Sequence, residues 1–469
     1  MAVIILLNSN GVFAYTSKSA FSNDSLVVNS IIIKGNNKTN LNVINRELLF
    51  QVGDTLYYED VHNLLLQSQL NLLKTSLFNF VVIDTVQNNN NIEVQINVEE
   101  RWYLWPSFAV IYGDRNFNEW WQTKNLNHLI YGGGFRQENF RGRNEQLSFY
   151  LTGGLERSFG LIYNDIYVDK KRKHSLLLKY LYTERTDIVY NTFQNKPLNY
   201  KSSSGILYWN HEIQFSYKFR SQINNSHQVW LKYSSTGIGE ELQEINPNFL
   251  GSNRNSLNYV MLYYIFRSDS RDSKNYPLQG IDFSVQLSNI IFEKSAQYHK
   301  NIYCVEGYFN NFAQISPRGH IAVGVNARVS YPNNQPFYLT QGFGALQYNL
   351  RGFEYYRIDG QKRLLIKALY KFTLIKPQII QLDFFVLKKM EKFNKIHYAL
   401  YCNLFADAGY VSDETNNYIL FQNNYVNQLI YSYGIGIDLE TYYDKVVRLE
   451  YSITKYGEAG IFLHFLAPI

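Results

Sequence analysis

Two different patterns of apolar and polar residues divide the chain near residue 101. Before this point, alternating stretches are mixed with stretches whose apolar residues recur every three or four positions. After Trp102, helical periodicity disappears and an alternation with a period of two recurs to the end of the chain. Alternate residues of a strand point to opposite faces, whereas one face of a helix repeats about every 3.6 residues. We therefore predict a small α+β module followed by an all-β domain.

The N-terminal module is predicted to have the order β-α-α-β-β over residues 25–101. A turn with Gly35 should follow its first strand, and Gly53 should separate its two helices. The expected elements are a strand at 27–34, a helix from Asn40 or Asn42 to Phe50, a helix at 57–78, and strands at 80–86 and 92–98.

The second part, residues 102–469, contains a long series of predicted strands. Segments such as 213–219, 281–287, 366–372 and 447–453 alternate apolar with polar residues. A soluble β-sandwich would alternate in the same way, and composition alone leaves that alternative open. Tyr and Phe at the segment ends favour the aromatic girdles of an outer-membrane β-barrel. At roughly 20–25 residues per strand and loop, with spanning strands of about 9–11 residues, this part accommodates about sixteen strands.

Composition changes the picture in two respects. The 469 residues are 46% hydrophobic and include 40 Tyr and 31 Phe, yet no run of 18 apolar residues exists, which argues against transmembrane helices. The net charge of +6 is small for this length, and no basic block is interleaved with aromatic residues, so we predict no nucleic-acid partner. The strongest basic run, residues 170–173, is predicted to be a solvated turn between two strands.

The sequence contains no recognisable catalytic or metal-binding pattern. Its two cysteines, Cys304 and Cys402, lie inside separate strand patterns without ligand spacing, and unpaired thiols are the favoured interpretation. The histidines are scattered, and no HExxH, GxSxG or phosphate-binding loop is present. We therefore predict no enzyme activity, no metal site and no cofactor.

Residues 1–24 are predicted to be a signal-peptide remnant and linker. A short apolar run at 2–7 is followed by Val12-Phe13-Ala14, which has the character of a small-residue cleavage site. A basic stretch ahead of the apolar run is missing.

The tripeptide Arg351-Gly352-Phe353 is unusual for a loop between two strand-like stretches. Its arginine offers a planar fork of donors that suits a buried carboxylate, and its glycine permits a close backbone approach or a positive φ. Asp407, which lies 56 residues downstream, is a candidate partner. Alternation in 398–407 groups Asp407 with polar and aromatic residues and places Leu400 and Leu404 on the opposite, lipid-type face. Asp407 is therefore expected to point inward.

These features together resemble the BamA/TamA-like superfamily of outer-membrane assembly and translocation proteins. Its members carry periplasmic POTRA modules ahead of a sixteen-stranded barrel of the bacterial surface antigen D15 type. The resemblance covers residues 25–469, and its motifs follow the family's order. They are the single POTRA at 25–101, including Phe78-Asn79-Phe80-Val81; a hairpin turn with Asn139 and Gly142; a turn with Asp269, Arg271, Asp272, Pro277 and Gly280; Arg351-Gly352-Phe353; and a strand with Phe405, Asp407 and Gly409.

The resemblance implies roles for several of these residues. The sixth extracellular loop should fold into the lumen, where Arg351 would pair with Asp407. The seam between the first strand, 107–116, and the last, 460–469, should open toward lipid so that a substrate strand can pair with an exposed edge. The end of the chain lacks the family's usual C-terminal aromatic residue, which leaves a frayed terminus as an alternative.

The POTRA edge at 80–86 is implied to bind an extended polypeptide, with a rigid spacer as the alternative. The edge residues are Phe80, Val81, Val82 and Ile83.

The implied location is the outer membrane, with the POTRA in the periplasm. The implied partners are outer-membrane lipids, unfolded β-barrel or secreted polypeptides, and periplasmic chaperones or lipoproteins. Three functions remain open at this point: an assembly factor for barrel proteins, a translocator for one dedicated partner protein, and a passive pore with a structural role. A single POTRA argues against the central assembly machine, and the absence of a second POTRA and a plug helix argues against a two-partner translocator.

Overall fold

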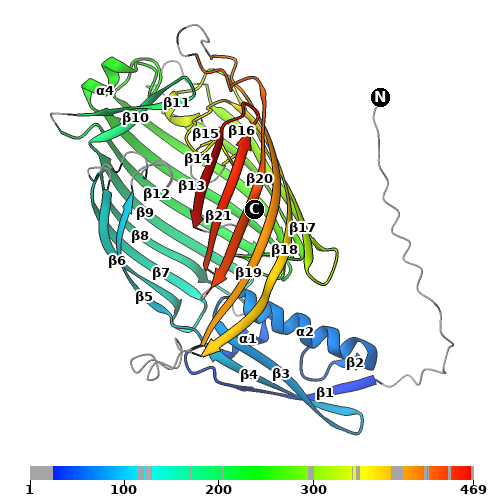
Figure 1. Cartoon of the computed structure of the whole chain (residues 1–469). Helices are drawn as coiled ribbons and strands as arrows, with labels where there is room; N and C mark the ends of the chain where they lie inside the picture. Colours follow the sequence, from blue (N-terminus) through cyan, green and yellow to red (C-terminus); the bar gives the residue numbers. More distant parts are fainter. Residues whose placement is uncertain are drawn as a thin grey trace.

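The computed structural model describes residues 25–112, 129–169, 171–202, 205–293, 300–340, 342–344, 349–381, 395–416, 422–441 and 445–465, together with residues 121, 124, 126 and 420. A small N-terminal α+β module lies below one sixteen-stranded antiparallel sheet that is rolled into a barrel (Figure 1). The predicted fold class is therefore confirmed. Residues 1–24, with the predicted signal segment, lie outside the described residues.

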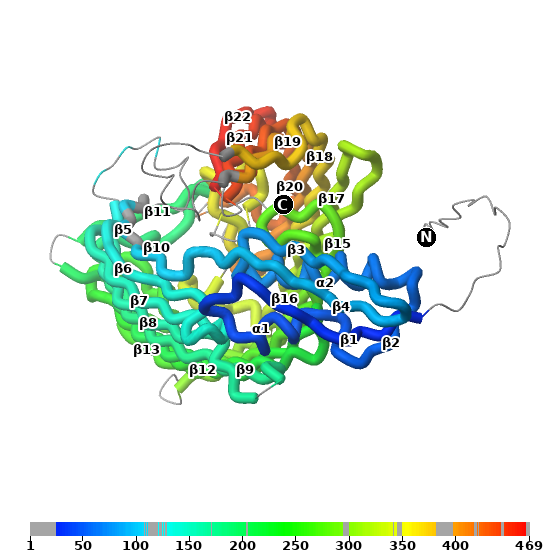
Figure 2. Tube along the Cα trace, turned by 90° about the horizontal axis from the view of Figure 1, so that it is seen from below, coloured from blue at the N-terminus to red at the C-terminus, as the bar shows by residue number. Residues whose placement is uncertain are grey.

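The N-terminal module packs two helices against a four-stranded sheet of order β2-β1-β4-β3. Its apolar core includes Val28, Phe50, Leu72 and Ile96, which are all almost fully buried. Seen from below, the module extends across part of the lower opening of the barrel (Figure 2). Its elements are β1 Ser25–Lys34, α1 Leu41–Asn45, β2 Thr55–Tyr57, α2 Tyr58–Lys74, β3 Phe78–Asn88 and β4 Asn91–Glu100.

The helix ends and the segment between the helices differ in detail from the sequence prediction. The first helix ends at Asn45 and not at Phe50, because the chain turns there and inserts Phe50 into the core from outside a helix. Asn40 occupies the N-cap position without a capping side-chain hydrogen bond. The second helix ends at Lys74, since Ser76 adopts a positive φ of 59° that no helix can continue. A short extra strand, β2, pairs with β1 between the helices.

The main sheet runs in the order β22-β21-β20-β19-β18-β17-β16-β15-β14-β13-β12-β9-β8-β7-β6-β5. Two strands, β10 and β11, form a separate hairpin, so β9 pairs directly with β12. The first nine barrel strands are β5 Leu104–Tyr112, β6 Leu129–Phe140, β7 Glu145–Gly154, β8 Glu156–Tyr167, β9 His174–Arg185, β12 Tyr208–Arg220, β13 Asn225–Ile238, β14 Ser256–Asp269 and β15 Gly280–Phe292. The remaining ones are β16 Ile302–Gln314, β17 Gly319–Tyr331, β18 Lys362–Gln381, β19 Lys395–Ser412, β20 Leu429–Thr441, β21 Lys445–Thr454 and β22 Ala459–Phe465; the separate hairpin is β10 Asp187–Phe193 and β11 Lys196–Lys201.

The alternation along the barrel strands has its apolar side outward. In β12, Glu212 and Ser216 are buried inside the barrel, whereas Ile213 and Phe215 are exposed on its outer surface. This arrangement is the reverse of a soluble protein and is the one expected of a barrel that faces lipid. Among the described residues, no helix is long and apolar enough to cross a membrane.

The ends of the barrel sheet differ in detail from the prediction. The first strand begins at Leu104 and not at Ser107, and residues 113–116 lie outside the described part. The last strand begins at Ala459, and residues 466–469 are likewise outside it. The five strands expected after Arg351 are all present, as β18 to β22. Cys304 and Cys402 are free thiols on β16 and β19.

Candidate functional site

The segment between β17 and β18 places Arg351 inside the barrel against Asp407 of β19. The Arg351 guanidinium donates from Nε to Asp407 Oδ2 over 2.7 Å and from Nη2 to Oδ1 over 2.5 Å. The Arg351 backbone N–H donates to Oδ2 as well, over 3.3 Å. Both side chains are nearly inaccessible, with 3% exposure for Arg351 and 2% for Asp407. Such a two-pronged, enclosed pair fixes the orientation of the loop more tightly than a single bond would.

A larger charged cluster surrounds this pair. The Arg351 guanidinium lies 4.0 Å from the centre of the Phe405 ring, and its Nη1 lies 3.3 Å from Glu450 Oε1. Glu450 is in turn 3.7 Å from Arg448, which forms a two-pronged pair with Asp438 at 2.7 and 2.8 Å. Cations and carboxylates thus alternate across β19, β20 and β21. Because each buried charge has an opposite charge beside it, the cluster can persist inside the barrel.

The two neighbours of Arg351 in the tripeptide explain how the loop packs inside the barrel. Gly352 has a φ of 83°, a conformation that favours glycine. The Phe353 ring is buried and meets the Tyr425 ring edge-on, with 5.6 Å between the ring centres. On the receiving strand, a Cβ added to Gly409 would come within 2.6 Å of the Phe343 ring. Glycine at position 409 therefore leaves room for the loop to pack against β19.

Sequence reasoning missed five residues of this cluster, which are Glu354, Asp438, Arg448, Glu450 and His464. His464 on the last strand, β22, lies 3.3 Å from Glu450 and 3.5 Å from Glu354, which follows the tripeptide by one residue. The loop and the last strand therefore meet through side chains. Glu450 was visible in the sequence only as one polar residue in an alternating strand. The available signal was its charge, since a carboxylate on the inner face of a barrel strand needs a partner.

The predicted hairpin turn after β6 is docked onto the POTRA. Asn139 Nδ2 donates to Thr39 Oγ1 over 2.8 Å, and Asn40 N–H donates to the carbonyl of Gly142 over 2.9 Å. Gly142 has a φ of 69°, and a side chain there would collide with the carbonyl of Lys38. This turn therefore joins the two domains, which the sequence did not reveal.

The predicted turn after β14 is held together by its own charges. Asp269 accepts two hydrogen bonds from the guanidinium of Arg271, at 2.9 and 2.8 Å. Asp272 accepts from the backbone N–H of Leu278 over 3.0 Å, and Gly280 begins β15 with a φ of 101°. These contacts fold the turn back on itself.

The folded turn reaches into the barrel. Tyr276 is buried and donates from its hydroxyl to Asp438 Oδ2 over 2.7 Å, the same carboxylate that Arg448 binds. The carbonyl of Pro277 accepts from Lys371 Nζ over 3.4 Å. The turn motif and the Arg351 cluster, which are separate in the sequence, are thereby connected through Asp438.

The predicted POTRA edge corresponds to β3, which is the outer strand of its sheet. Val81 faces the core, whereas Val82 is 49% exposed and Ile83 is half-buried. The Phe80 ring lies 5.1 Å from the His397 ring of β19, so the start of this edge is adjacent to the barrel. A role for the edge in binding a polypeptide remains a prediction.

The basic turn at 170–173 differs from its predicted solvated character. Lys170 lies outside the described residues, and Lys171 and Lys173 are exposed. Arg172, however, is buried against the POTRA, where it donates to the carbonyl of Arg143 over 3.0 Å and its own carbonyl accepts from Arg46. The turn is solvated only in part because the POTRA covers one side of it.

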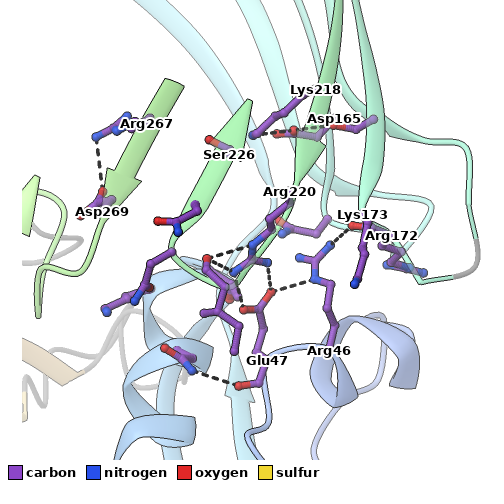
Figure 3. A pocket seen from close by; sticks show the side chains of 18 of the residues that line it. Arg46, Glu47, Asp165, Arg172, Lys173, Lys218, Arg220, Ser226, Arg267 and Asp269 are labelled. Carbon is purple, nitrogen blue, oxygen red and sulfur yellow. Dashed lines mark hydrogen bonds and ion pairs between the residues drawn. The ribbon is translucent and has the colours of Figure 1, made fainter. Parts of the chain in front are cut away.

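An ion pair between the domains lies next to this turn. Glu47 of the POTRA accepts two hydrogen bonds from Arg220 at the end of β12, at 2.6 and 2.9 Å, and one from Arg46 at 2.8 Å (Figure 3). Burial by itself would raise the pKa of Glu47, but Arg220 and Arg46 together hold this pKa below its ordinary value. The pair therefore favours the docked arrangement only while Glu47 is ionised.

We predict that Glu47→Gln weakens the attachment of the POTRA to the barrel. We expect acidic pH to have the same effect on the wild type. A carboxylate whose folded pKa is lowered contributes stability above its unfolded pKa and loses that contribution as the pH falls through the folded value. Spin labels at the exposed positions Gln87 and Lys171 would report the distance between the domains by double electron–electron resonance. The distance distribution should broaden in the variant at pH 7, and in the wild type as the pH falls below the ordinary pKa of a glutamate and through the lowered pKa of Glu47. An equally narrow distribution in the variant would contradict the prediction.

The described residues contain no group of three or more His, Cys, Asp or Glu side chains that could hold a metal ion.

Two protein-family models match the sequence, one in each of its two parts. The Omp85 superfamily domain matches residues 139–443, which is more than half of the chain, and the surface antigen variable number repeat of the POTRA family matches residues 26–101. No curated protein matches the sequence.

Among solved structures, the chain is similar to BamA from Haemophilus ducreyi lacking POTRA domains 1–3. The TM-score is 0.52 and the identity 16%, with 94% of this chain and 84% of that chain covered. It is also similar to CdiB from Escherichia coli, with a TM-score of 0.53, 9% identity, and 94% and 75% of the two chains covered. At these identities the similarity extends to the fold alone.

The family match and the architecture agree with each other. A sixteen-stranded barrel with an apolar outer face and one POTRA implies an outer-membrane protein whose POTRA lies in the periplasm. The outer-membrane location predicted from the sequence is thereby confirmed. The family has a general role in outer-membrane protein assembly or secretion. The chain belongs to the Omp85 superfamily.

Proposed function

We propose that this protein passes unfolded polypeptides from the periplasm into or across the outer membrane, through a seam between β5 and β22. The polypeptides in question are β-barrel proteins to be inserted or secreted proteins to be exported. The observation that carries the proposal is the order of the main sheet. Every other neighbouring pair in it is joined by a ladder of backbone pairs, whereas β5 and β22 are its two ends and share no ladder among the described residues.

The chemistry of a strand edge supports a seam that accepts another strand. An unpaired edge presents backbone N–H and C=O groups, and leaving these groups unsatisfied next to hydrocarbon costs several kcal/mol for each group. An incoming strand of a substrate would satisfy the groups of both β5 and β22.

The contacts of the Arg351 loop support a role in controlling this seam. Glu354 of the loop and Glu450 of β21 both lie beside His464 of β22, at 3.5 and 3.3 Å. The position of the loop and the position of the edge strand are therefore coupled in the proposed mechanism. A loop that leaves the Arg351 site would release one of the contacts that hold β22.

The interior of the barrel argues against the passive pore as the alternative. Several polar side chains are buried inside the barrel and belong to one network, among them Arg351, Tyr276, Asp438 and Arg448. An open channel for small solutes would instead keep such groups in water. A dedicated translocator for one partner protein remains the second candidate, because a substrate strand at the seam serves export as well as insertion.

Depletion of the protein followed by quantitative proteomics of the outer membrane tests the proposal. Broad loss of barrel proteins is expected for an insertion factor, and loss of one secreted protein for a dedicated translocator. Re-expression of the intact chain should restore the lost proteins in either case. An unchanged outer-membrane and secreted proteome after depletion would overturn the proposal and favour a structural role.

A further inference from the structure

A cavity of about 290 Å³ lies between the POTRA and the lower end of the barrel, and it is strongly basic (Figure 3). Eight Lys and Arg side chains line it, against only three Asp and Glu side chains. All three acids are already engaged: Glu47 by Arg220 and Arg46, Asp165 by Lys218, and Asp269 by Arg267 and Arg271. The cavity therefore carries a positive charge that its own carboxylates do not balance.

Four of the lining cations have no carboxylate within ion-pair distance among the described residues. They come from three separate elements, the end of α2, the β8–β9 turn and the β14–β15 turn, and are Lys74, Arg172, Lys173 and Lys274. Arg172 is 5% exposed, and both its burial and the neighbouring Arg46 and Arg143 lower its pKa. A buried cation beside other cations is unfavourable unless an anion joins it. The cluster is thus arranged for an anionic ligand.

The position of the cavity restricts what that ligand can be. Lys218, Arg220 and Arg267 lie on the inward-facing positions of their strands, alternating with the residues of the outer, lipid-facing surface. Lipid headgroups around the barrel are therefore separated from the cavity by the barrel wall. What reaches the cavity must come from the periplasm past the POTRA, or from the interior of the barrel.

We propose that this cavity binds carboxylate groups of an acidic, extended polypeptide segment as the segment moves from the POTRA into the barrel. Cations that come from three separate elements around the cavity suit several charges spread along a chain better than one compact anion. This inference rests on the proposed handling of polypeptides and adds a preference for acidic segments at the entrance.

Binding of a fluorescent peptide of ten glutamates to the purified full-length chain in detergent tests the inference at low ionic strength. The triple variant Lys74→Gln, Lys173→Gln, Lys274→Gln should bind about tenfold more weakly than the wild type, since each exposed ion pair contributes modestly. The matched control is Lys171→Gln, Lys201→Gln, Lys300→Gln, which removes three exposed lysines that do not line the cavity. Its affinity should equal that of the wild type, and salt should weaken binding to both.

Several outcomes of the peptide measurement would overturn the inference: no binding of the glutamate peptide to the wild type, equal loss of binding in the two triple variants, or equal binding of a ten-lysine peptide. Displacement of the peptide by inorganic phosphate at micromolar concentration would also overturn it, because it would indicate a site for a compact anion. The peptide measurement does not depend on insertion or export. An unchanged proteome after depletion would therefore reject the proposed function separately, whatever the peptide does.

Discussion

Replacing Arg351 with alanine is expected to abolish function and to weaken the folded barrel by about 3–5 kcal/mol, the usual effect of removing one partner of a buried pair. The variant would leave Asp407 and Glu450 buried without the guanidinium that now contacts both carboxylates. Electrophoresis without heating would report the barrel as a loss of the compact, fast-migrating form. Complementation of a depleted strain would report function.

Two further variants test whether the charge of Arg351 or its two-pronged contact with Asp407 is responsible for these effects. Arg351→Lys keeps the charge but loses the planar fork, so partial stability and reduced function are expected. The double variant Arg351→Leu with Asp407→Leu removes both charges and should recover stability, because replacement of a buried pair by apolar residues is often tolerated. If the double variant also recovered full function, the pair would be only structural. Wild-type mobility and activity of Arg351→Ala would contradict the prediction altogether.

A disulfide between β5 and β22 is expected to abolish function reversibly. One cysteine within Leu104–Tyr112 and one within Ala459–Phe465 would be introduced after Cys304→Ser and Cys402→Ala remove the native thiols. The bond would hold the two sheet ends together and deny a substrate strand its pairing edge. Activity should fall at least about tenfold on oxidation and return on reduction, a fall that corresponds to about 1.4 kcal/mol.

The matched control places a disulfide across a ladder that is already complete. Ile435 and Tyr451 are directly opposed on β20 and β21, and both are exposed on the outer surface. Opposed residues of an antiparallel pair lie close enough for a disulfide, so Ile435→Cys with Tyr451→Cys should cross-link without loss of activity. Full activity of the oxidised β5–β22 variant would show that the seam does not need to open.

Periodicity and short motifs were sufficient to predict most of the fold from the sequence. The alternation of residues such as Ile213 and Phe215 with polar neighbours follows from two environments on the two faces of one strand, so it is visible in a single chain. The predicted positions of the helix ends were less accurate. Phe50 has helical spacing from Val43 but packs into the core after a turn, and sequence spacing cannot distinguish these two routes.

The candidate site was only half visible for a related reason. Arg351, Gly352 and Phe353 form a compact motif, and the inward position of Asp407 follows from alternation within its own strand. Glu450 and His464 are ordinary polar positions in their strands, and they acquire a role only because the barrel brings β19, β21 and β22 to one loop.

The sequence by itself determined the two-part architecture, the barrel with its apolar outer face, and the residues that resemble the family's motifs. These properties depend on local spacing, which the order of residues records directly. The tertiary structure alone decided that Asn139 and Arg220 dock the POTRA, that Tyr276 reaches Asp438, and that a basic cavity opens between the domains. Those contacts join residues up to 173 positions apart. Only the curvature of the sheet into a barrel and the placement of the POTRA beneath it bring such distant residues together.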